Sequence, residues 1–428
     1  MGFKAGALRA ILLAALSILV VSTPVCAAER TVIVALFDGF SPAMADATKT
    51  PNLDIIKREG AWSRHLVPAF PSLSLANHTT FATGCWPEHH GILSNAFYDP
   101  KLGRFSEQTA NIVDADWRTG CESIWEAAER QGVRTAAFNW AGRWSHTRGK
   151  TATYANPPAA HGTKPSDEAI LADALKLLAD NGPNHPRLIA LYFRGPDLNA
   201  HYHGVTAPQT LAAVREADSI VGGMMAGIRA LPKGREGTLI VGTDHGMIDV
   251  GPLINVGRLM NMYDIKARQA TDGATAFLYL DKGESADRVA KVLAPYKDIF
   301  QVYRKGHFPA YAHLGNGPRV PDLMLITHPP YWIIGPEVLP AWADLLGVNH
   351  FWPAVFTPFM GGLKATHGYD PNIVQMHGIF YSWGAGVAKG REITRLDMID
   401  IHPTVMKLLS LQPGRPVDGK PVAALFAK

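Results

Sequence analysis

The chain has 428 residues, of which 47% are hydrophobic and 18% are charged, and its formal net charge is +4 at pH 7. This length suits one large α/β domain or two smaller ones, and the hydrophobic fraction is enough for a sizeable core. The charge is small and no block of like charges accompanies it, which argues against an obligate nucleic-acid partner.

The first 28 residues are typical of a secretory signal peptide. Lys4 and Arg9 precede an apolar run at 10–21, and small residues lie where a signal peptidase would cut, near Ala28. The run is too short and wrongly flanked to favour the alternative, an uncleaved membrane anchor. We therefore expect a periplasmic or secreted protein without a stable membrane span, whose formal charge falls from +4 to +2 when Lys4 and Arg9 are removed.

Short apolar runs alternate with amphipathic stretches through the first 250 residues. The predicted strands are 31–37, 133–139, 188–193 and 238–243. The predicted helices are 51–60, 75–83, 122–131, 167–180 and 207–230. This alternation favours an α/β fold with a mostly parallel sheet that is covered by helices on both faces.

The alternation weakens between residues 251 and 364. This region has short strands, one predicted helix at 286–293 and a stretch rich in Pro, Trp and Phe. We interpret it as a smaller lobe inserted into an α/β core that comprises residues 29–250 and 365–428. The core pattern then resumes with a predicted strand at 378–383 and a predicted helix at 400–409.

Two cysteines remain after the predicted signal peptide, Cys85 and Cys121. They could pair in an oxidising compartment, but two cysteines do not make a disulfide framework. We favour two separate buried thiols over a bond between them.

Ionisable side chains follow three of the predicted strands, and a further histidine lies where the chain returns from the insert. They are Asp38 in ALFDGF, Asp197 and His201 in YFRGPDLNAH, Asp244 and His245 in VGTDHGM, and His367 in KATHGYD. Singly, an Asp–Gly pair is usually a turn and a histidine a surface residue. Ligands of open α/β sheets bind at this edge, however, and three carboxylates there would repel one another without cations. Mixed Asp and His ligands favour zinc over magnesium or calcium.

Ser74 lies where the helix at 75–83 would begin. Its plain interpretation is a helix N-cap. The functional interpretation uses the same geometry, because a helix N-terminus attracts phosphate and a neighbouring zinc would activate the hydroxyl. The sequence has no Gly-x-Ser-x-Gly elbow and no P-loop, which disfavours a triad hydrolase or an NTPase. We interpret Asn77 and His78 as structural residues of this helix.

These motifs resemble the nucleotide pyrophosphatase/phosphodiesterase family of the alkaline phosphatase superfamily, in order from Asp38 to Asp370 and again in the ending VDGKPVAALF. The resemblance implies an alkaline-phosphatase-like fold and two zinc ions per chain. The ligand sets that it implies are Asp197, His201 and His367 for one ion, and Asp38, Asp244, His245 and Ser74 for the other. It also implies that Ser74 is the nucleophile, and that Asn95 in HGILSN binds a phosphoryl oxygen together with backbone N–H groups after Ser74.

The sequence departs from the family pattern at Ser74, where Thr is usual, and in SLANH and PDLNAH. Serine is chemically competent, so we expect an exported hydrolase of small phosphate diesters, with nucleotides as candidate substrates and phospho-serine as the intermediate. The alternatives are a phosphomonoesterase or phosphonate hydrolase on the same fold, and a zinc-stabilised binding protein without turnover. A sulfatase is disfavoured, because the Cys/Ser-x-Pro-x-Arg sequence is missing.

Charge near the phosphate bears on the choice between diester and monoester. Ser74 and Asn95 are neutral, which suits the single charge of a diester, whereas Arg143 would favour the monoester if it reached the site. The second substituent of a diester also needs a surface. Aromatic residues before His367 could provide it, although they could equally form the core of the lobe: Tyr331, Trp332, Phe351, Trp352 and Phe356.

Overall fold

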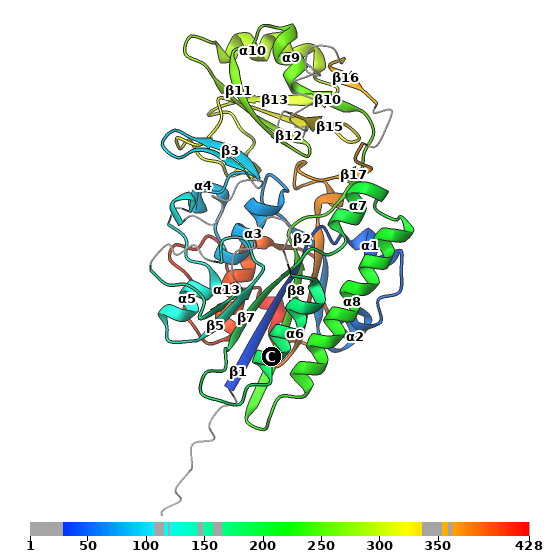
Figure 1. The fold of residues 1–428 in the computed structure, drawn as a ribbon, viewed down its shortest axis with the longest axis vertical. Helices are drawn as coiled ribbons and strands as arrows, with labels where there is room; N and C mark the ends of the chain where they lie inside the picture. The colour runs from blue at the N-terminus through cyan, green and yellow to red at the C-terminus, as the bar shows by residue number, and fades with distance from the viewer. Residues whose placement is uncertain are drawn as a thin grey trace, which may run out of the picture.

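The computed structural model describes residues 29–106, 115–118, 120–143, 149–156, 165–335, 353–357 and 362–427. Figure 1 shows a larger α/β core with a smaller lobe above it. The predicted signal peptide lies outside the described residues. Within them, no helix combines the length and the apolar character that a membrane span needs.

The core is built around a nine-stranded sheet with the order β19-β2-β18-β8-β1-β7-β5-β6, in which β20 pairs with β2. The strands are β1 (Glu29–Phe37), β2 (Ala61–Val67), β5 (Thr135–Phe138), β6 (Tyr154–Ala155), β7 (Leu188–Phe193), β8 (Arg235–Thr243), β18 (Gly378–Gly384), β19 (Arg391–Glu392) and β20 (Leu396–Asp397). Strand β1 runs parallel to β7 and β8, whereas β18 runs antiparallel to β8 and β2. The prediction of a mostly parallel sheet is confirmed, and β2 is a strand that we did not predict.

Helices cover both faces of this sheet, because successive residues of β1 are buried on opposite sides. Ile33, Ala35 and Phe37 belong to one hydrophobic cluster, and Val32, Val34 and Leu36 belong to another. The first cluster includes α1 (Pro42–Asp46), α2 (Pro51–Glu59), α6 (Asp167–Leu178) and α8 (Pro208–Arg229). The second includes α3 (Ser74–Thr83), α5 (Ile124–Arg130) and α13 (Ile401–Leu408). Figure 1 shows these two helix layers on either side of the sheet.

The smaller lobe contains a four-stranded antiparallel sheet with the order β11-β12-β14-β13 and a three-stranded sheet with the order β15-β10-β16. Their strands are β10 (Leu253–Asn255), β11 (Ala267–Asp272), β12 (Thr275–Leu280), β13 (Phe300–Arg304), β14 (Leu323–Thr327), β15 (Trp332–Ile334) and β16 (Val355–Phe356). Helices α9 (Val256–Met262) and α10 (Ala286–Leu293) share a hydrophobic cluster with these strands.

The chain enters and leaves the lobe at adjacent points. Strand β9 (Ile248–Asp249) pairs antiparallel with β17 (Ala365–Thr366), and the Val250 N–H donates to the Lys364 carbonyl at 2.9 Å. On the strength of this pairing we propose that residues 251–364 form one insert.

A buried ion pair joins the lobe to the core. Arg319 of the lobe donates from Nε to Asp99 Oδ2 at 2.6 Å and from Nη1 to the Gly91 carbonyl at 2.9 Å. Asp99 ends β3 (Ala96–Asp99), which forms a hairpin with β4 (Gly103–Ser106). The Arg319 and Asp99 side chains are only 10% and 9% exposed. This ion pair is one contact between lobe and hairpin, beside a hydrophobic cluster that both share, and removing one partner would leave a buried charge.

Cys85 and Cys121 are joined by a disulfide bond, which corrects our expectation of two separate thiols. Both cysteines are buried, and the bond ties the loop after α3 to the segment before α5. The expectation was wrong because proximity across 36 residues depends on how α3 and α5 pack, which cysteine spacing does not encode. Closing a loop of this size typically stabilises a fold by about 2–4 kcal/mol.

Candidate active site

The parallel register of the central strands brings three aspartates to one edge of the sheet. Phe37 of β1 is aligned with Phe193 of β7 and with Thr243 of β8, so the residues that follow emerge together. The loop after β1 makes a close approach at Gly39, whose φ is +62° and whose Cβ, if present, would lie 2.8 Å from Asp197 Oδ1. Glycine is therefore required for Asp38 and Asp197 to lie this close together.

One cluster combines Asp197, His201 and His367, whose candidate ligand atoms all lie within 4.8 Å of one another. Asp197 and His201 are one turn apart on α7 (Asp197–His203), and His367 directly follows β17. Nε2 of His201 lies 3.4 Å from Asp197 Oδ2, and Nε2 of His367 lies 3.8 Å from Asp197 Oδ1. The structure thus brings together the residues of the first predicted ligand set.

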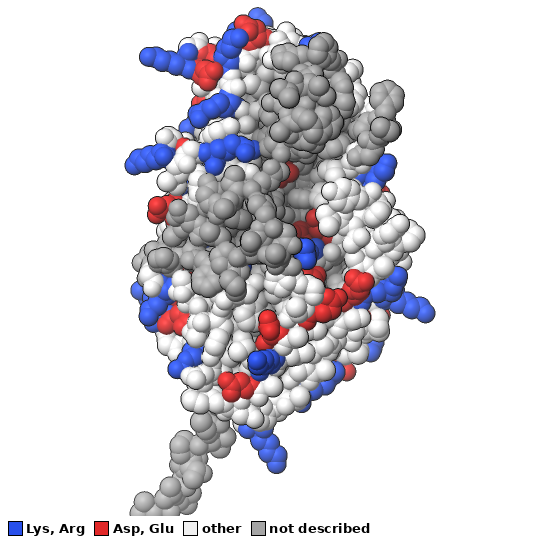
Figure 2. Space-filling model, viewed as in Figure 1, with Lys and Arg blue, Asp and Glu red and all other residues white. Residues whose placement is uncertain are grey.

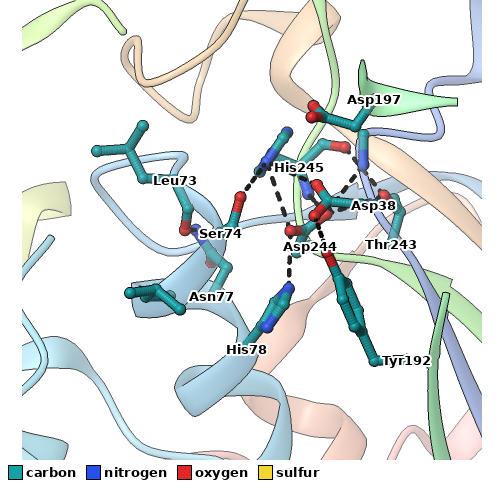
Figure 3. Close-up of polar contacts among 12 residues, drawn as sticks. Asp38, Leu73, Ser74, Asn77, His78, Tyr192, Asp197, Thr243, Asp244 and His245 are labelled. Carbon is teal, nitrogen blue, oxygen red and sulfur yellow. Dashed lines mark hydrogen bonds and ion pairs between the residues drawn. The ribbon is translucent and has the colours of Figure 1, made fainter. Parts of the chain in front are cut away.

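A second cluster combines Asp38, Asp244, His245 and Ser74 (Figure 3). Nε2 of His245 lies 3.4 Å from Asp38 Oδ1, 3.4 Å from Asp244 Oδ2 and 3.1 Å from Ser74 Oγ. The rings of His245 and His367 are stacked with their centroids 3.6 Å apart. The two predicted ligand sets therefore lie side by side.

All three histidines present the same nitrogen to the carboxylates. Nδ1 of His201, His245 and His367 lies 2.8, 2.9 and 2.9 Å from the carbonyl oxygens of Ala365, Gly246 and Ser72, respectively. A carbonyl only accepts hydrogen bonds, so Nδ1 of each ring carries a proton and Nε2 is the nitrogen that faces the carboxylates. In a neutral ring Nε2 offers a lone pair, which carboxylate oxygens repel unless a cation lies between them. Such hydrogen bonds from the other ring nitrogen are usual for metal-binding histidines.

The electrostatics of the clusters also fit divalent cations. Asp38 Oδ1 and Asp197 Oδ1 are buried and have no hydrogen-bond partner within the described part of the chain. Burial, followed by the charges of Asp244 and Asp197, raises the pKa of Asp38 well above its ordinary value. Burial, followed by the neighbouring His245 and His201, lowers the pKa of His367 well below its ordinary value. Two buried carboxylate oxygens thus lack a donor within the described part of the chain, and His367 is held in its neutral, ligand-competent form.

Ser74 is the first residue of α3, and the N-cap position belongs to Leu73, which makes no side-chain capping bond. The N-cap interpretation of Ser74 is therefore wrong. Its Oγ faces His245 instead, and the serine is 8% exposed. Asn77 bonds the backbone of Ala69, Pro71 and Leu73, which is the structural role that we expected for it.

Asn95 lines the same cleft as Ser74, and its Oδ1 accepts the backbone N–H of Leu75 at 2.7 Å. Only the oxygen of an amide accepts a hydrogen bond, so this contact fixes the orientation of the side chain. It also corrects our expectation for the backbone N–H groups after Ser74, because the first of them is already bonded to Asn95.

Two further residues contact the aspartates, and sequence reasoning missed both contacts. Nε2 of His78 lies 3.1 Å from Asp244 Oδ2, and the Tyr192 hydroxyl donates to Asp38 Oδ2 at 2.5 Å (Figure 3). The available signals were the i, i+4 spacing of Ser74 and His78 on one helix and the place of Tyr192 near the end of β7. Burial acts to raise the pKa of Asp244, but His245 and the hydrogen bond from His78 outweigh it and lower that pKa. His78 is thus part of the charged cluster as well as of the helix.

A cleft of about 340 Å³ lies between core and lobe, and its lining includes Asp38, Ser74 and Asp197. Figure 2 shows a hollow with acidic and basic side chains there. Among the described members of the predicted aromatic set, Trp332 lines the cleft, whereas Phe356 packs against the buried cluster of Trp332. Phe351 and Trp352 lie outside the described residues.

Arg143, which would favour a monoester if it reached the site, is not the cation that lines the cleft. Arg143 is buried, does not line the cleft, and donates to the carbonyl oxygens of Trp140 and Asn156 at 3.0 Å each. Arg194, in the loop between β7 and α7, lines the cleft. Its place just after a strand, in YFRGPD, was the signal that sequence reasoning passed over.

A mostly parallel α/β sheet that carries adjacent Asp/His clusters and a serine at one edge has the side chains that hydrolysis of a phosphate ester requires. A model of the type I phosphodiesterase / nucleotide pyrophosphatase family matches residues 32–370, and the chain belongs to this family. It is therefore a hydrolase of the phosphodiesterase and nucleotide pyrophosphatase class.

Individual relatives agree with this assignment. The chain is 26% identical over 424 residues to ectonucleotide pyrophosphatase/phosphodiesterase family member 7 of Rattus norvegicus, covering 95% of this chain and 91% of that protein. It is 27% identical over 376 residues to venom phosphodiesterase 2 of Crotalus adamanteus, covering 85% of this chain and 43% of that protein. The fold is similar to an inactive variant of murine ectonucleotide pyrophosphatase/phosphodiesterase 5 in complex with AMP, with a TM-score of 0.80, 24% identity, and coverage of 93% of this chain and 100% of that chain.

Proposed function

We propose that this protein is an exported two-zinc phosphodiesterase that hydrolyses phosphate diesters through a phospho-serine intermediate on Ser74. The observation that carries the proposal is the position of Ser74 Oγ, 3.1 Å from His245 Nε2, beside two clusters of Asp and His residues. Family membership supports the reaction class. The AMP in the murine complex supports a nucleotide as one candidate substrate.

The two clusters divide the proposed ligands between the ions. Asp197, His201 and His367 would hold one zinc, and Asp38, Asp244, His245 and Ser74 would hold the other. When bound, the ions supply the missing positive charge, lower the pKa of the serine hydroxyl and stabilise the charge of the leaving oxygen. Asp and imidazole ligands in this mixture suit zinc better than magnesium or calcium.

The residues of the chain supply the nucleophile and orient the phosphate. Oγ of Ser74 attacks phosphorus, so that a P–O bond to Ser74 forms and the bond to the leaving oxygen breaks. Water next attacks the phospho-serine, which restores the hydroxyl and releases the phosphomonoester. Because Oδ1 of Asn95 is held by Leu75, its Nδ2 is the group that donates to a phosphoryl oxygen. The N-terminus of the ten-residue helix α3 adds favourable potential for the phosphate.

Export is a second part of the proposal. It is supported by the pattern of residues 1–28, and by the buried Cys85–Cys121 disulfide, since such bonds persist in oxidising compartments.

The phosphomonoesterase alternative gains support from one observation, the presence of Arg194 in the cleft. An arginine that contacts the transferred phosphoryl group would favour a monoester dianion over a diester.

Initial rates of the zinc-loaded protein on three nitrophenyl substrates test these functions: a phosphodiester, a phosphomonoester and a phosphonate. We expect kcat/KM for the diester to exceed the other two by about tenfold or more. A faster monoester would establish the phosphatase, and a faster phosphonate would establish the phosphonate hydrolase. Zinc binding without turnover of any substrate would establish a binding protein.

A further inference from the structure

We propose that Arg194 forms a subsite for an anionic group on the leaving side of the scissile phosphate. The proposal deepens the proposed function: it names Arg194 as the residue that selects esters whose leaving group carries its own phosphate. Such substrates are anhydrides, for example a nucleoside triphosphate that is cleaved to release pyrophosphate.

Arg194 is the one Lys or Arg among the described residues that line the cleft. The cleft also contains carboxylates from three places, Asp38, Asp197 and Asp272. A second phosphate on the substrate would be repelled by carboxylates not neutralised by cations, so it needs a cation of its own. A guanidinium suits this purpose because its planar fork binds phosphate oxygens in pairs.

The guanidinium of Arg194 is little used by the protein itself. Its Nη2 donates to the Pro165 carbonyl at 3.5 Å, which is its single hydrogen bond within the described part of the chain. The nearby Asp167 accepts the backbone N–H of Arg194, at 3.3 Å, rather than the side chain. Most of the donors on this exposed side chain therefore remain available to a ligand.

The backbone holds Arg194 at the edge of the site. The next residue, Gly195, has a φ of +51°, and a Cβ there would lie 2.9 Å from the Asp38 carbonyl oxygen. Only glycine permits this approach, so the loop passes directly against the end of β1. The base of the Arg194 side chain is fixed next to the reacting groups, even though its tip is exposed.

The position of the loop indicates the leaving side. Ser74 lies against His245, and Arg194 lies three residues before Asp197, which the proposed function assigns to the other ion together with His201 and His367. In an in-line displacement the leaving oxygen departs opposite the nucleophile, toward the cluster that does not hold Ser74. Leu198, Trp332, Ile333 and Leu363 form an apolar wall of the same cleft, which leaves the charged part of a substrate to Arg194.

The test compares kcat/KM of zinc-loaded wild-type protein, Arg194→Gln and Arg194→Lys on ATP and on a nitrophenyl ester of thymidine monophosphate. Both are cleaved to release a nucleoside monophosphate, but only ATP has a phosphorylated leaving group. We expect Arg194→Gln to lower kcat/KM for ATP about 10- to 100-fold, which corresponds to loss of a charged hydrogen bond. The loss for the nitrophenyl ester should be at least tenfold smaller, and Arg194→Lys should recover part of the ATP activity.

The matched control is Arg215→Gln, because Arg215 is exposed on α8, bonds Thr48 and does not line the cleft. It should change neither substrate more than about twofold. Equal losses on both substrates in Arg194→Gln, or no loss on ATP, would overturn the proposal. A loss confined to a nitrophenyl monoester would also overturn it, by assigning Arg194 to the transferred phosphoryl group.

A binding measurement separates this inference from the proposed function. Calorimetry of zinc-loaded protein with AMP and with the α,β-methylene analogue of ATP requires no turnover. Arg194→Gln should weaken binding of the analogue about tenfold or more and leave AMP within about threefold. This result with no turnover of either substrate would reject the proposed catalysis and retain the subsite, whereas equal binding of the analogue by wild type and variant would reject the subsite.

Discussion

The two walls of the cleft are built in different ways. On the core side, His201 and His367 line the cleft, and each is held by a hydrogen bond from Nδ1 to a backbone carbonyl. On the lobe side, Trp332 and Ile333 present apolar surface from a short strand. The difference teaches that the reacting groups depend on the ends of buried parallel strands, while the surface that meets the rest of the substrate comes from the region that we propose as an insert.

Ser74→Ala removes the proposed nucleophile from the core side of the cleft and should have the largest effect. We expect kcat to fall about a thousandfold or more, because the covalent step loses its nucleophile. Stability should change by less than about 1 kcal/mol, since the Ser74 hydroxyl does not cap α3. Thr83→Ala, at the other end of the same helix, is the control and should keep its turnover. Near-normal turnover in Ser74→Ala, with reduced stability, would contradict the assignment.

Replacing single ligands breaks the core wall one cluster at a time. Asp244→Asn and His367→Ala should each lower zinc from two ions per chain to one and reduce kcat/KM by about a thousandfold. His78→Gln should keep both ions but weaken zinc affinity about 10- to 100-fold, because His78 only orients Asp244. Elemental analysis after gel filtration gives the zinc content, and a chelator titration gives the affinity. Wild-type zinc content and activity in both ligand variants would exclude these ligand sets.

Arg319→Met breaks the attachment of the lobe instead. It leaves the Asp99 carboxylate buried without its partner, which should cost about 3–5 kcal/mol of unfolding free energy. The double variant Arg319→Met/Asp99→Leu should recover much of this loss, because no buried charge then remains. Urea denaturation of the three proteins measures both effects. If the double variant is as unstable as the single one, the ion pair is not what holds the lobe.

A buried histidine of the core, His402, should make the unfolding free energy depend on pH, and this effect does not involve the lobe. His402 of α13 bonds the Ala82 carbonyl through Nδ1 and accepts the Gly414 N–H at Nε2, at 2.8 and 2.7 Å. Burial lowers the pKa of His402 to about 4. The unfolded chain, with a pKa of about 6.5, binds more protons between these two values, so stability falls as the pH drops below about 6.5.

The expected loss approaches about 3 kcal/mol at pH 4 and is about 1 kcal/mol at pH 5.5. Urea unfolding of metal-free wild type and His402→Gln at several pH values measures it without interference from zinc loss. The stability difference between the two proteins should shrink as the pH falls. Parallel pH curves would show that His402 does not make this contribution.

Local patterns were sufficient for much of the fold. The strand at 188–193 and the helix at 286–293 have the predicted bounds, because an apolar run and an amphipathic period each mark them clearly. The aspartates were predicted to meet because carboxyl ends of parallel strands share an edge, and the register of β1 with β7 and β8 places them there. Their roles as zinc ligands are still proposals.

The contacts that we missed depend on packing between distant segments. His78 reaches Asp244 across 166 positions of sequence, and Cys85 meets Cys121 only because α3 and α5 lie in the same layer. Strand β2 was missed since its residues Ser63, Arg64 and His65 weaken the apolar pattern, and its pairing with β18 forms only after the chain returns from the lobe. Arg194 was passed over because no spacing rule ties an exposed arginine to a cleft.

If residues 251–364 form one insert, as we propose, the pairing of β9 with β17 would make this lobe exchangeable. Since the chain leaves and re-enters the core at adjacent backbone positions, a lobe of another length could be grafted there without changing the register of the central sheet. Such a chimera has to retain Lys364, the last residue of the proposed insert, and Ala365, the first residue of the returning core. Lys364 donates its N–H to the His201 carbonyl, and the Ala365 carbonyl accepts from His201 Nδ1. The backbone at the end of the lobe therefore also holds the His201 imidazole in place.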